Sequence, residues 1–375
     1  MDSSSATVTE PLSEASWRAL FDAASDHTLG VEEELMLLDP DTLDLLPESE
    51  RAVAAMGEHG GLRTELPAAQ VEIVTRVYDS IPGAIDAVTA TRRGLAAAVA
   101  PWAKLAGAGT HPFADPRGVL LGLPRYERLA DEYRWAIEQQ LVFGLHIHVG
   151  VRGADRALAV FNALRSYLPE LAALAGNAPL HAGRDTGLAS VRPKLSEMLP
   201  RQGIAPAFAS WKALADFATW VEPAAGDIWW EVRPHSTFGT LEIRVPDTQA
   251  TVEETAGVVA LATGLVAWLA ERHDSGERLP VHDSARIAEN RWRALRHGLN
   301  GEMLDLASGV PDPTRGRVQR LIETVAPAAG RLGGAGALEQ AHALAEHNGA
   351  ERQRALHAQG GLRGVVEWLA EAFAP

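Results

Sequence analysis

Cysteine is absent from the 375-residue chain, and lysine occurs only at Lys104, Lys194 and Lys212. Without cysteine the chain cannot form disulfides, zinc–thiolate sites or a cysteine nucleophile, and this composition suits a reducing compartment. No Gly-x-x-x-x-Gly-Lys segment is present, and no Gly-x-Gly-x-x-Gly follows a predicted strand. The sequence therefore does not support a P-loop or a Rossmann dinucleotide site.

Excess positive charge and long hydrophobic runs are missing as well. The formal net charge of −15 argues against non-specific binding to nucleic acid or anionic membranes. The most hydrophobic run, 256–270, is shorter than a membrane span of about 20 residues. It follows the capping-box pattern Thr251-Val-Glu-Glu254, so we expect a buried core helix. Residues 1–12 lack the basic and apolar parts of a secretory signal, and we expect them to be disordered. These features predict a cytoplasmic protein without nucleic-acid or membrane partners.

Periodicity and turn residues predict strands in the first two thirds of the chain and helices in the last third. We expect strands over 28–38, 62–66, 70–75, 105–110, 143–151, 227–233 and 239–246, with a hairpin partner at 43–46. We expect helices over 13–24, 49–58, 82–103, 125–139, 154–174 and 216–221. Further helices are expected over 251–272, 283–297, 313–328, 336–347, 349–358 and 361–373. The pattern predicts an α+β fold in a single domain, 13–375, with a largely antiparallel sheet at 28–246 and a helical block at 251–373.

Three consecutive carboxylates stand in the first strand, Leu29–Leu38. Because strand side chains alternate, Glu32 and Glu34 share one face and Glu33 lies on the other. Two carboxylates roughly 5 Å apart repel by about 3 kcal/mol at an effective dielectric near 20. The segment contains no basic residue, so a cation from elsewhere or bulk water must offset this repulsion. We expect Glu33 to be structural, paired with a helix N-terminus or an arginine.

Three later strands repeat this arrangement of one apolar and one polar face. Their polar faces carry Glu72, then His146 with His148, then Glu242 with Arg244. If all apolar faces meet the helices of one common sheet, the polar faces converge in one acidic trough. Carboxylates with few imidazoles suit Mg²⁺ or Mn²⁺, and their number predicts two or more ions. Such clusters typically neutralise a nucleotide triphosphate, and Arg244 would add fixed positive charge at developing negative oxygens.

Each of these features also has an ordinary structural interpretation. A single glutamate can be a solvated edge residue, His146 and His148 can be a packed core pair or a zinc site, and Glu242 with Arg244 can be a surface pair. Agreement across four strands favours a shared site. Three other functions stay open on residues alone: a phosphotransferase of the guanidino-kinase type, a metal-dependent hydrolase built on the two histidines, and a non-catalytic nucleotide-binding protein.

Several sequence blocks between residues 28 and 365 match a known family. The chain resembles the YbdK-type carboxylate–amine ligases, also called type 2 glutamate–cysteine ligases. The matching blocks are LGVEEELMLLDPDT, TELPAAQVEIVT, GTHPF, FGLHIHVGV, NAPLHAGRDTGLASVRP, IWWEVRPHSTFGTLEIRVPDTQ, NRWRALRHGL and GAERQRAL.

The resemblance implies a glutamine-synthetase-like catalytic domain with a curved, mainly antiparallel sheet and helices on its convex face. It implies ATP, two or three Mg²⁺ ions (or Mn²⁺) and a carboxylate substrate, usually glutamate. The γ-carboxylate would attack the γ-phosphoryl group of ATP, and an amine such as cysteine would capture the acyl phosphate as an amide. A ligase for a different acid and amine is the alternative. The family also implies a possible homodimer.

The resemblance also assigns roles by motif position. It implies metal binding by Glu32, Glu34, Glu65, Glu72, His146 and Glu242. It implies catalysis by Arg244, Glu242 and Arg233, and nucleotide contacts by Arg244, Arg233 and His148. It implies substrate contacts by Arg192, Thr186, Asp185 and His235, with 181–196 as a lid. The chain departs from the family at Arg233-Pro-His-Ser-Thr and at Asp185-Thr-Gly-Leu188. These departures leave the identities of the acid and the amine open.

Overall fold

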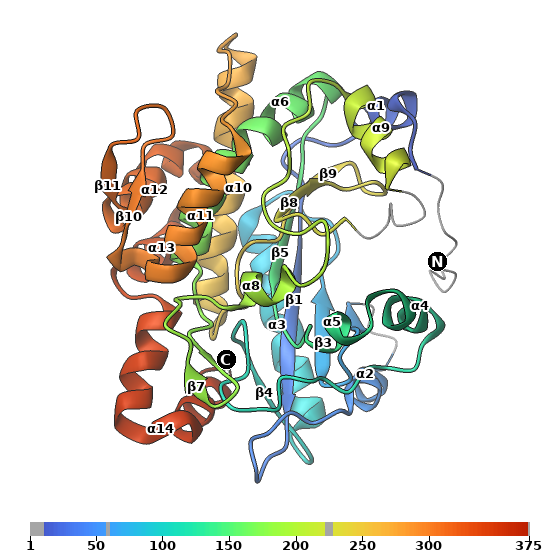
Figure 1. Cartoon of the computed structure of the whole chain (residues 1–375), viewed down its shortest axis with the longest axis vertical. Helices are drawn as coiled ribbons and strands as arrows, with labels where there is room; N and C mark the ends of the chain where they lie inside the picture. Colours follow the sequence, from blue (N-terminus) through green and yellow to red (C-terminus); the bar gives the residue numbers. More distant parts are fainter. Residues whose placement is uncertain (1–10, 58–60, 222–227, 374–375) are drawn as a thin grey trace.

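A seven-stranded antiparallel sheet forms the centre of the computed structural model, which describes residues 11–57, 61–221 and 228–373 (Figure 1). Its strands run in the order β2-β3-β1-β5-β9-β8, and β4 pairs with the far end of β1. The strands are β1 Leu29–Leu38, β2 Leu62–Thr64, β3 Gln70–Val74, β4 Lys104–Ala106, β5 Leu145–Gly150, β8 Val232–Pro234 and β9 Thr240–Ile243. The predicted α+β class and antiparallel sheet are confirmed.

Helices pack against one face of this sheet, and a helical block closes the chain (Figure 1). The helices of the first part are α1 Glu14–Asp22, α2 Ser49–Met56, α3 Ile81–Val99, α4 Pro124–Tyr133, α5 Trp135–Glu138, α6 Ala154–Leu164, α7 Leu168–Leu174, α8 Arg192–Ser196 and α9 Trp211–Trp220. The later helices are α10 Val252–Asp274, α11 Ser284–His297, α12 Thr314–Arg331, α13 Ala335–Glu346 and α14 Gly349–Phe373. Short 3-10 turns occupy Arg165–Tyr167 and Gly298–Asn300.

Helix α10 packs against α3, α6 and β5 and contributes to the large apolar cluster that also contains residues of the sheet. It begins at a capping box, in which Thr251 accepts from the Glu254 N–H and Glu254 accepts from the Thr251 N–H. By length and composition alone α10 resembles a membrane span, but 89% of its most apolar window is buried inside the protein. The prediction of a core helix is therefore confirmed.

Glu33 points into this apolar side and meets a buried arginine on α3. Arg92 donates from Nε to Glu33 Oε2 at 2.7 Å and from Nη2 to Oε1 at 2.6 Å, and both side chains are fully buried. The Thr255 hydroxyl on α10 donates to the same carboxylate at 2.8 Å. The expected structural role of Glu33 is confirmed, because the carboxylate ties β1 to the helices behind it.

Several elements differ from the predicted ones. The predicted strand 227–233 shrinks to β8, because the N–H groups of Trp229 and Glu231 donate to the Arg201 and Gly203 carbonyls rather than to a neighbouring strand; Asp227 lies outside the described residues. Helix α9 begins five residues earlier than predicted, where Ser210 caps it. Two short hairpins were not predicted: β6 Leu180–His181 with β7 Arg184–Asp185, and β10 Glu302–Leu304 with β11 Pro311–Pro313.

The polar face of β1 is open along only half its length. Beyond Glu34, Met36 and Leu38 on that face belong to an apolar cluster with Val365 and Leu369 of α14. Helix α14 of the C-terminal block therefore covers this end of the strand in addition to the helices behind the sheet. This covering confines the open polar surface to the part of the sheet around Glu32 and Glu34.

Candidate active site

Strand register brings the predicted polar residues onto one surface. Glu32 lies opposite His146, and Glu34 lies opposite Glu72. His148 lies opposite Glu242. Directly opposed residues of an antiparallel pair share a face. The predicted convergence of four strands is therefore confirmed.

The first cluster of potential metal ligands consists of Glu32, His146 and Glu242. Each offers one ligand atom, and these atoms all lie within 4.8 Å of one another. His146 Nδ1 is 3.4 Å from Glu32 Oε2. Glu242 is held from two sides: Arg233 donates from Nε to Oε2 at 2.6 Å, and Arg244 Nη1 donates to Oε1. This pairing fixes the orientation of the Glu242 carboxylate.

A second cluster, formed by Glu34, Glu72 and His146, adjoins the first through the shared imidazole. Its ligand atoms also lie within 4.8 Å of one another. The Gly144 N–H donates to Glu34 Oε2 and orients this carboxylate. The two clusters place oxygen and imidazole donors around two adjacent points, so the residues fit a pair of hard divalent cations.

The titration behaviour of these groups fits a cation site. Burial and the charge of Glu65 raise the pKa of Glu34 to about 7. Burial, followed by the charges of neighbouring glutamates, raises the pKa of Glu72 well above its ordinary value. Burial and the nearby Arg244 lower the pKa of His146 to about 4, so its ring is neutral at pH 7 and can donate a lone pair. A divalent cation would relieve the repulsion among the carboxylates.

Among the described residues, both clusters lack one predicted ligand, Glu65. Its side chain is partly buried and lines the cavity next to Glu34. Its charge raises the pKa of both Glu34 and Glu72, which places it near the second cluster.

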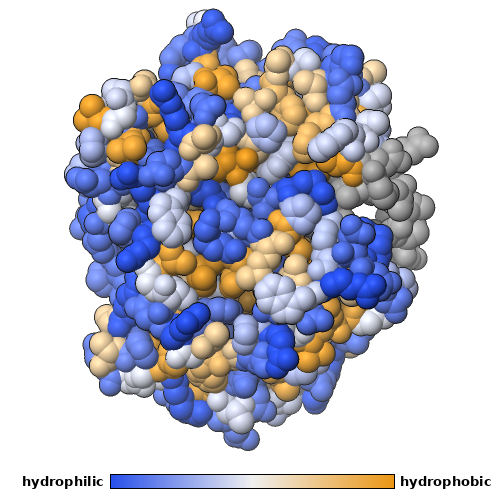
Figure 2. All heavy atoms as spheres, viewed as in Figure 1, coloured by the Kyte–Doolittle hydropathy of each residue, from blue (hydrophilic) through white to orange (hydrophobic). Residues whose placement is uncertain are grey.

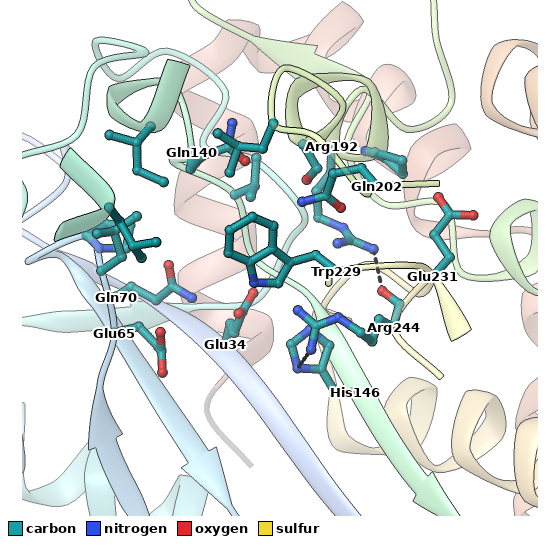
Figure 3. A pocket seen from close by; sticks show the side chains of 18 of the residues that line it. Glu34, Glu65, Gln70, Gln140, His146, Arg192, Gln202, Trp229, Glu231 and Arg244 are labelled. Atoms are coloured by element: carbon teal, nitrogen blue, oxygen red, sulfur yellow. Dashed lines mark hydrogen bonds between the residues drawn. The ribbon is translucent and has the colours of Figure 1, made fainter. Parts of the chain in front are cut away.

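A cavity opens on the Glu34 side of the two clusters (Figure 3). Its polar wall consists of Glu34, Glu65, Gln70, Tyr126, Gln140, His146, Arg192, Ser196, Gln202, Glu231, Arg244 and Arg291. Its apolar wall consists of Leu66, Pro67, Leu129, Ile137, Val142, Pro193, Leu199 and Trp229. In the view of Figure 1, the middle of the molecular surface shows hydrophobic side chains mixed with hydrophilic ones (Figure 2). The mixed lining of the cavity can therefore contact both polar and apolar parts of a bound molecule.

Arg192 reaches this cavity from α8, but most of its guanidinium is bound by the protein. Its Nε donates to Asp247 at 2.7 Å, and Nη2 donates to the Val245 carbonyl at 2.6 Å and the Pro246 carbonyl at 2.9 Å. Arg192 therefore holds the end of the Arg244 segment in place beside the cavity.

A second pocket opens on the other side of Glu242. It is lined by Pro11, Leu12, Trp17, Leu214, Phe217, Ala218, Ile228, Trp230, Arg233, Pro234, His235, Ser236 and Thr237. The ring of His235 stacks on Phe238 at 4.4 Å and lies 5.2 Å from the ring of His148. His148 Nδ1 is 3.0 Å from the Thr240 hydroxyl. Arg233 thus connects this pocket with the carboxylate of the first ligand cluster.

The structure does not bring Asp185 and Thr186 to the site. Asp185 pairs with Arg354 on α14 at 2.8 Å, and the Thr186 hydroxyl donates to the Pro179 carbonyl at 2.9 Å. Neither is among the described residues that line the cavity or the second pocket. Their contact with substrate stays a prediction.

Among the charged residues that line the cavity, two were not predicted from the sequence, Glu231 and Arg291. Glu231 shares the strand phase of Arg233 in the segment DIWWEVR, which was the available signal. Arg291 comes from the distant helix α11 and lies in the family block NRWRALRHGL, but nothing in that block indicated a place in the cavity. Trp229 lines the cavity and Trp230 is buried in the core.

Comparison with solved structures places the fold among those of ligases. The crystal structure of a glutamate–cysteine ligase from Francisella tularensis in complex with AMP is similar, with a TM-score of 0.69, 11% identity, and coverage of 94% of this chain and 90% of that one. A bifunctional glutathione synthetase from Pasteurella multocida is also similar, with a TM-score of 0.62 and 14% identity, over 96% of this chain and 52% of that one.

Sequence comparison narrows this class to one family. The model of glutamate-cysteine ligase family 2 matches residues 28–371. A protein of Rubrobacter xylanophilus named as a glutamate–cysteine ligase 2-3 is 38% identical, over 94% of this chain and 99% of its own length. A Thermobifida fusca protein named as a glutamate–cysteine ligase 2 is 36% identical, over 94% of this chain and 92% of its own length. The chain belongs to glutamate-cysteine ligase family 2 and is an enzyme of that ligase type.

Proposed function

We propose that the protein joins a carboxylic acid to an amine at the expense of ATP, with glutamate as the preferred acid and an amino acid such as cysteine as the amine. The observation that carries this proposal is the pair of ligand clusters sharing His146, with Arg244 beside them. Paired clusters of this kind suit the transfer of a phosphoryl group. Family membership supports the amide-forming outcome.

The second pocket and the Glu32–His146–Glu242 cluster form the proposed ATP side. Aromatic walls at Trp17, Phe217 and Trp230 suit the stacking of a base. The buried Trp17 Nε1–H has no hydrogen-bond partner within the described part of the chain, so it is available to an acceptor on the base. Arg233 and His148 lie between this pocket and the ligand cluster. The phosphate groups of a bound ATP would lie beside these two side chains.

The cavity of Figure 3 forms the proposed acid and amine side. Here Glu34, Glu72 and Glu65 would hold cations next to the reacting carboxylate. Arg244 lies between the two sides, within reach of Glu242 and 3.5 Å from His146 Nδ1. Its guanidinium would stabilise the negative charge that develops on the oxygens shared by the phosphoryl donor and acceptor.

Two or three Mg²⁺ ions, replaceable by Mn²⁺, are the proposed metals at Glu32, Glu34, Glu65, Glu72, His146 and Glu242. When bound, they would neutralise phosphate oxygens and hold them in line with the acid. The side chains of the protein supply the rest. Arg233 and Arg244 orient Glu242, and the apolar wall of Leu66, Ile137, Val142 and Leu199 limits hydrolysis of the activated acid.

The first test is ADP release with glutamate and a panel of amines, followed by mass analysis of the product. The proposal expects ADP release that requires glutamate, an amine and Mg²⁺, together with an amide product. No glutamate-dependent turnover with any amine would overturn the assignment of glutamate. A stable phosphorylated product without an amide would identify a phosphotransferase instead.

A further inference from the structure

Glu231 lies beside Arg244 on the surface that carries the ligand clusters. The Arg244 N–H donates to the Glu231 carbonyl at 2.7 Å. This bond continues the register in which Arg233 lies opposite Glu242. Glu231 is therefore the cross-strand neighbour of Arg244, with both side chains on the same face. Both also line the cavity of Figure 3.

One oxygen of the Glu231 carboxylate is bound by the protein and the other is not. Oε1 accepts from Arg291 Nε at 2.7 Å and lies 2.5 Å from Arg291 Nη2. Oε2 is buried and has no hydrogen-bond partner among the residues that the structure describes. The side chain is only 8% exposed. A buried carboxylate oxygen without a donor is costly, so this atom is suited to a donor that arrives with a ligand.

The surrounding charges do not satisfy this oxygen. Arg291 divides its guanidinium between Glu231 and Glu197, because its Nη1 donates to Glu197. Lys194 lies on the far side of this group, where it pairs with the second oxygen of Glu197. An ionised carboxylate oxygen only accepts hydrogen bonds, so its complement is a cationic or neutral N–H donor.

We propose that Glu231 Oε2 binds the ammonium group of a substrate and so sets the preference for that substrate over an analogue that lacks the group. The inference rests on the proposed function, which assigns this cavity to the acid and the amine. Cross-strand neighbours have Cβ atoms about 5 Å apart. Glutamate carries its ammonium group two methylenes and the α-carbon away from the γ-carboxylate. A glutamate whose γ-carboxylate faces Arg244 could turn its ammonium group toward Glu231, because both side chains line the same cavity.

The test compares glutamate with glutarate, which lacks only the ammonium group, in the wild-type enzyme and in Glu231→Gln. Glutamine keeps the size of the side chain and an oxygen for Arg291 but removes the charge. We expect the preference for glutamate in kcat/KM to fall by roughly tenfold to a hundredfold, the worth of a hydrogen bond to a charged group. We expect the KM for ATP to stay unchanged. If the ammonium group belongs to the amine substrate, the KM for that amine rises instead and the glutamate preference stays.

The matched control is Glu197→Gln, which also loses a carboxylate paired with Arg291 but does not line the cavity. It is expected to keep both substrate preferences. Melting temperatures of the two variants show whether the fold is intact. The binding of glutamate and of glutarate can also be measured from the fluorescence of Trp229 and its neighbours. This measurement needs no turnover, so it tests the inference even if no amide forms. The inference is overturned if Glu231→Gln and the wild type show the same preference for glutamate over glutarate and the same KM for the amine.

Discussion

Glu34 lies directly opposite Glu72 on adjacent strands. A carboxylate oxygen of each and a ring nitrogen of His146 all lie within 4.8 Å of one another. Burial, and after it the charge of Glu65, favours the protonated form of Glu34 and raises its pKa to about 7 from an ordinary value of 4.5. Between these values the folded protein holds a proton that the unfolded chain releases. Without metal, the contribution of Glu34 to stability therefore falls as the pH rises through this range.

A divalent cation must displace that proton, so the stabilisation that Mg²⁺ provides should grow with pH. We expect Mg²⁺ to raise the melting temperature more at pH 8 than at pH 6, on either side of the Glu34 pKa of about 7. Thermal unfolding with and without Mg²⁺ measures the difference. The double variant Glu34→Gln, Glu72→Gln should lose this dependence. An equal Mg²⁺ effect at both pH values would contradict the assignment of these residues.

Among the carboxylates of the site, removal of Glu242 should reduce turnover the most. It belongs to the first ligand cluster, and it is paired with both Arg233 and Arg244. Glu242→Gln removes the ligand charge and frees the two arginines, so we expect kcat to fall by about a hundredfold or more. Glu289→Gln, which alters an exposed pair with Arg293, should keep normal activity. Near-normal ADP release by Glu242→Gln would remove the residue from the site.

Gly144 leaves room for three side chains of the site. A Cβ atom there would lie 3.1 Å from His146 Nε2 and from Arg192 Nη1, and 3.3 Å from Glu34 Oε2. Gly144→Ala should therefore displace the ligands slightly and raise the Mg²⁺ concentration needed for half-maximal activity by about tenfold. Gly122→Ala is the control, because nothing lies within 4 Å of its added Cβ. The same Mg²⁺ requirement in both variants would show that Gly144 has no such role.

Glu33 should matter for stability. Its partner Arg92 is completely buried, and the Gln249 and Ala250 carbonyls also accept from that guanidinium. Glu33→Ala leaves a buried positive charge without its carboxylate, which costs about 3–5 kcal/mol. Glu367→Ala breaks an exposed pair with Arg363 and should cost less than about 1 kcal/mol. Denaturant unfolding of both variants measures the difference, and equal losses would refute this account of Glu33.

The alternation of side chains made much of the ligand surface predictable. In β1 the period of two by itself separates Glu32 and Glu34 from Glu33, and the register with β5 places His146 opposite Glu32. Each strand combined a strongly apolar face with a polar one, so a single common sheet determined which residues meet. The sequence predicted only the kind of partner that Glu33 needs, a helix N-terminus or an arginine. It did not identify Arg92, because this residue lies far from β1 in the chain.

Contacts between distant segments could not be predicted in this way. Arg291 reaches Glu231 from a helix of the C-terminal block, and only the packing of that block decides which side chains enter the cavity. Asp185 belongs to a family motif, yet the hairpin that carries it turns toward Arg354. The covering of β1 by α14 likewise depends on the kink at Gly361, whose φ of 67° lets the chain change direction.

The central claim is that the enzyme phosphorylates the carboxylate of its acid substrate before an amine captures it. The most direct measurement supplies glutamate labelled with heavy oxygen in its γ-carboxylate, together with ATP, Mg²⁺ and the amine, and follows the label by phosphorus NMR. We predict that one labelled oxygen per turnover appears in inorganic phosphate and the other stays in the amide. Amide formation with unlabelled phosphate would contradict the account.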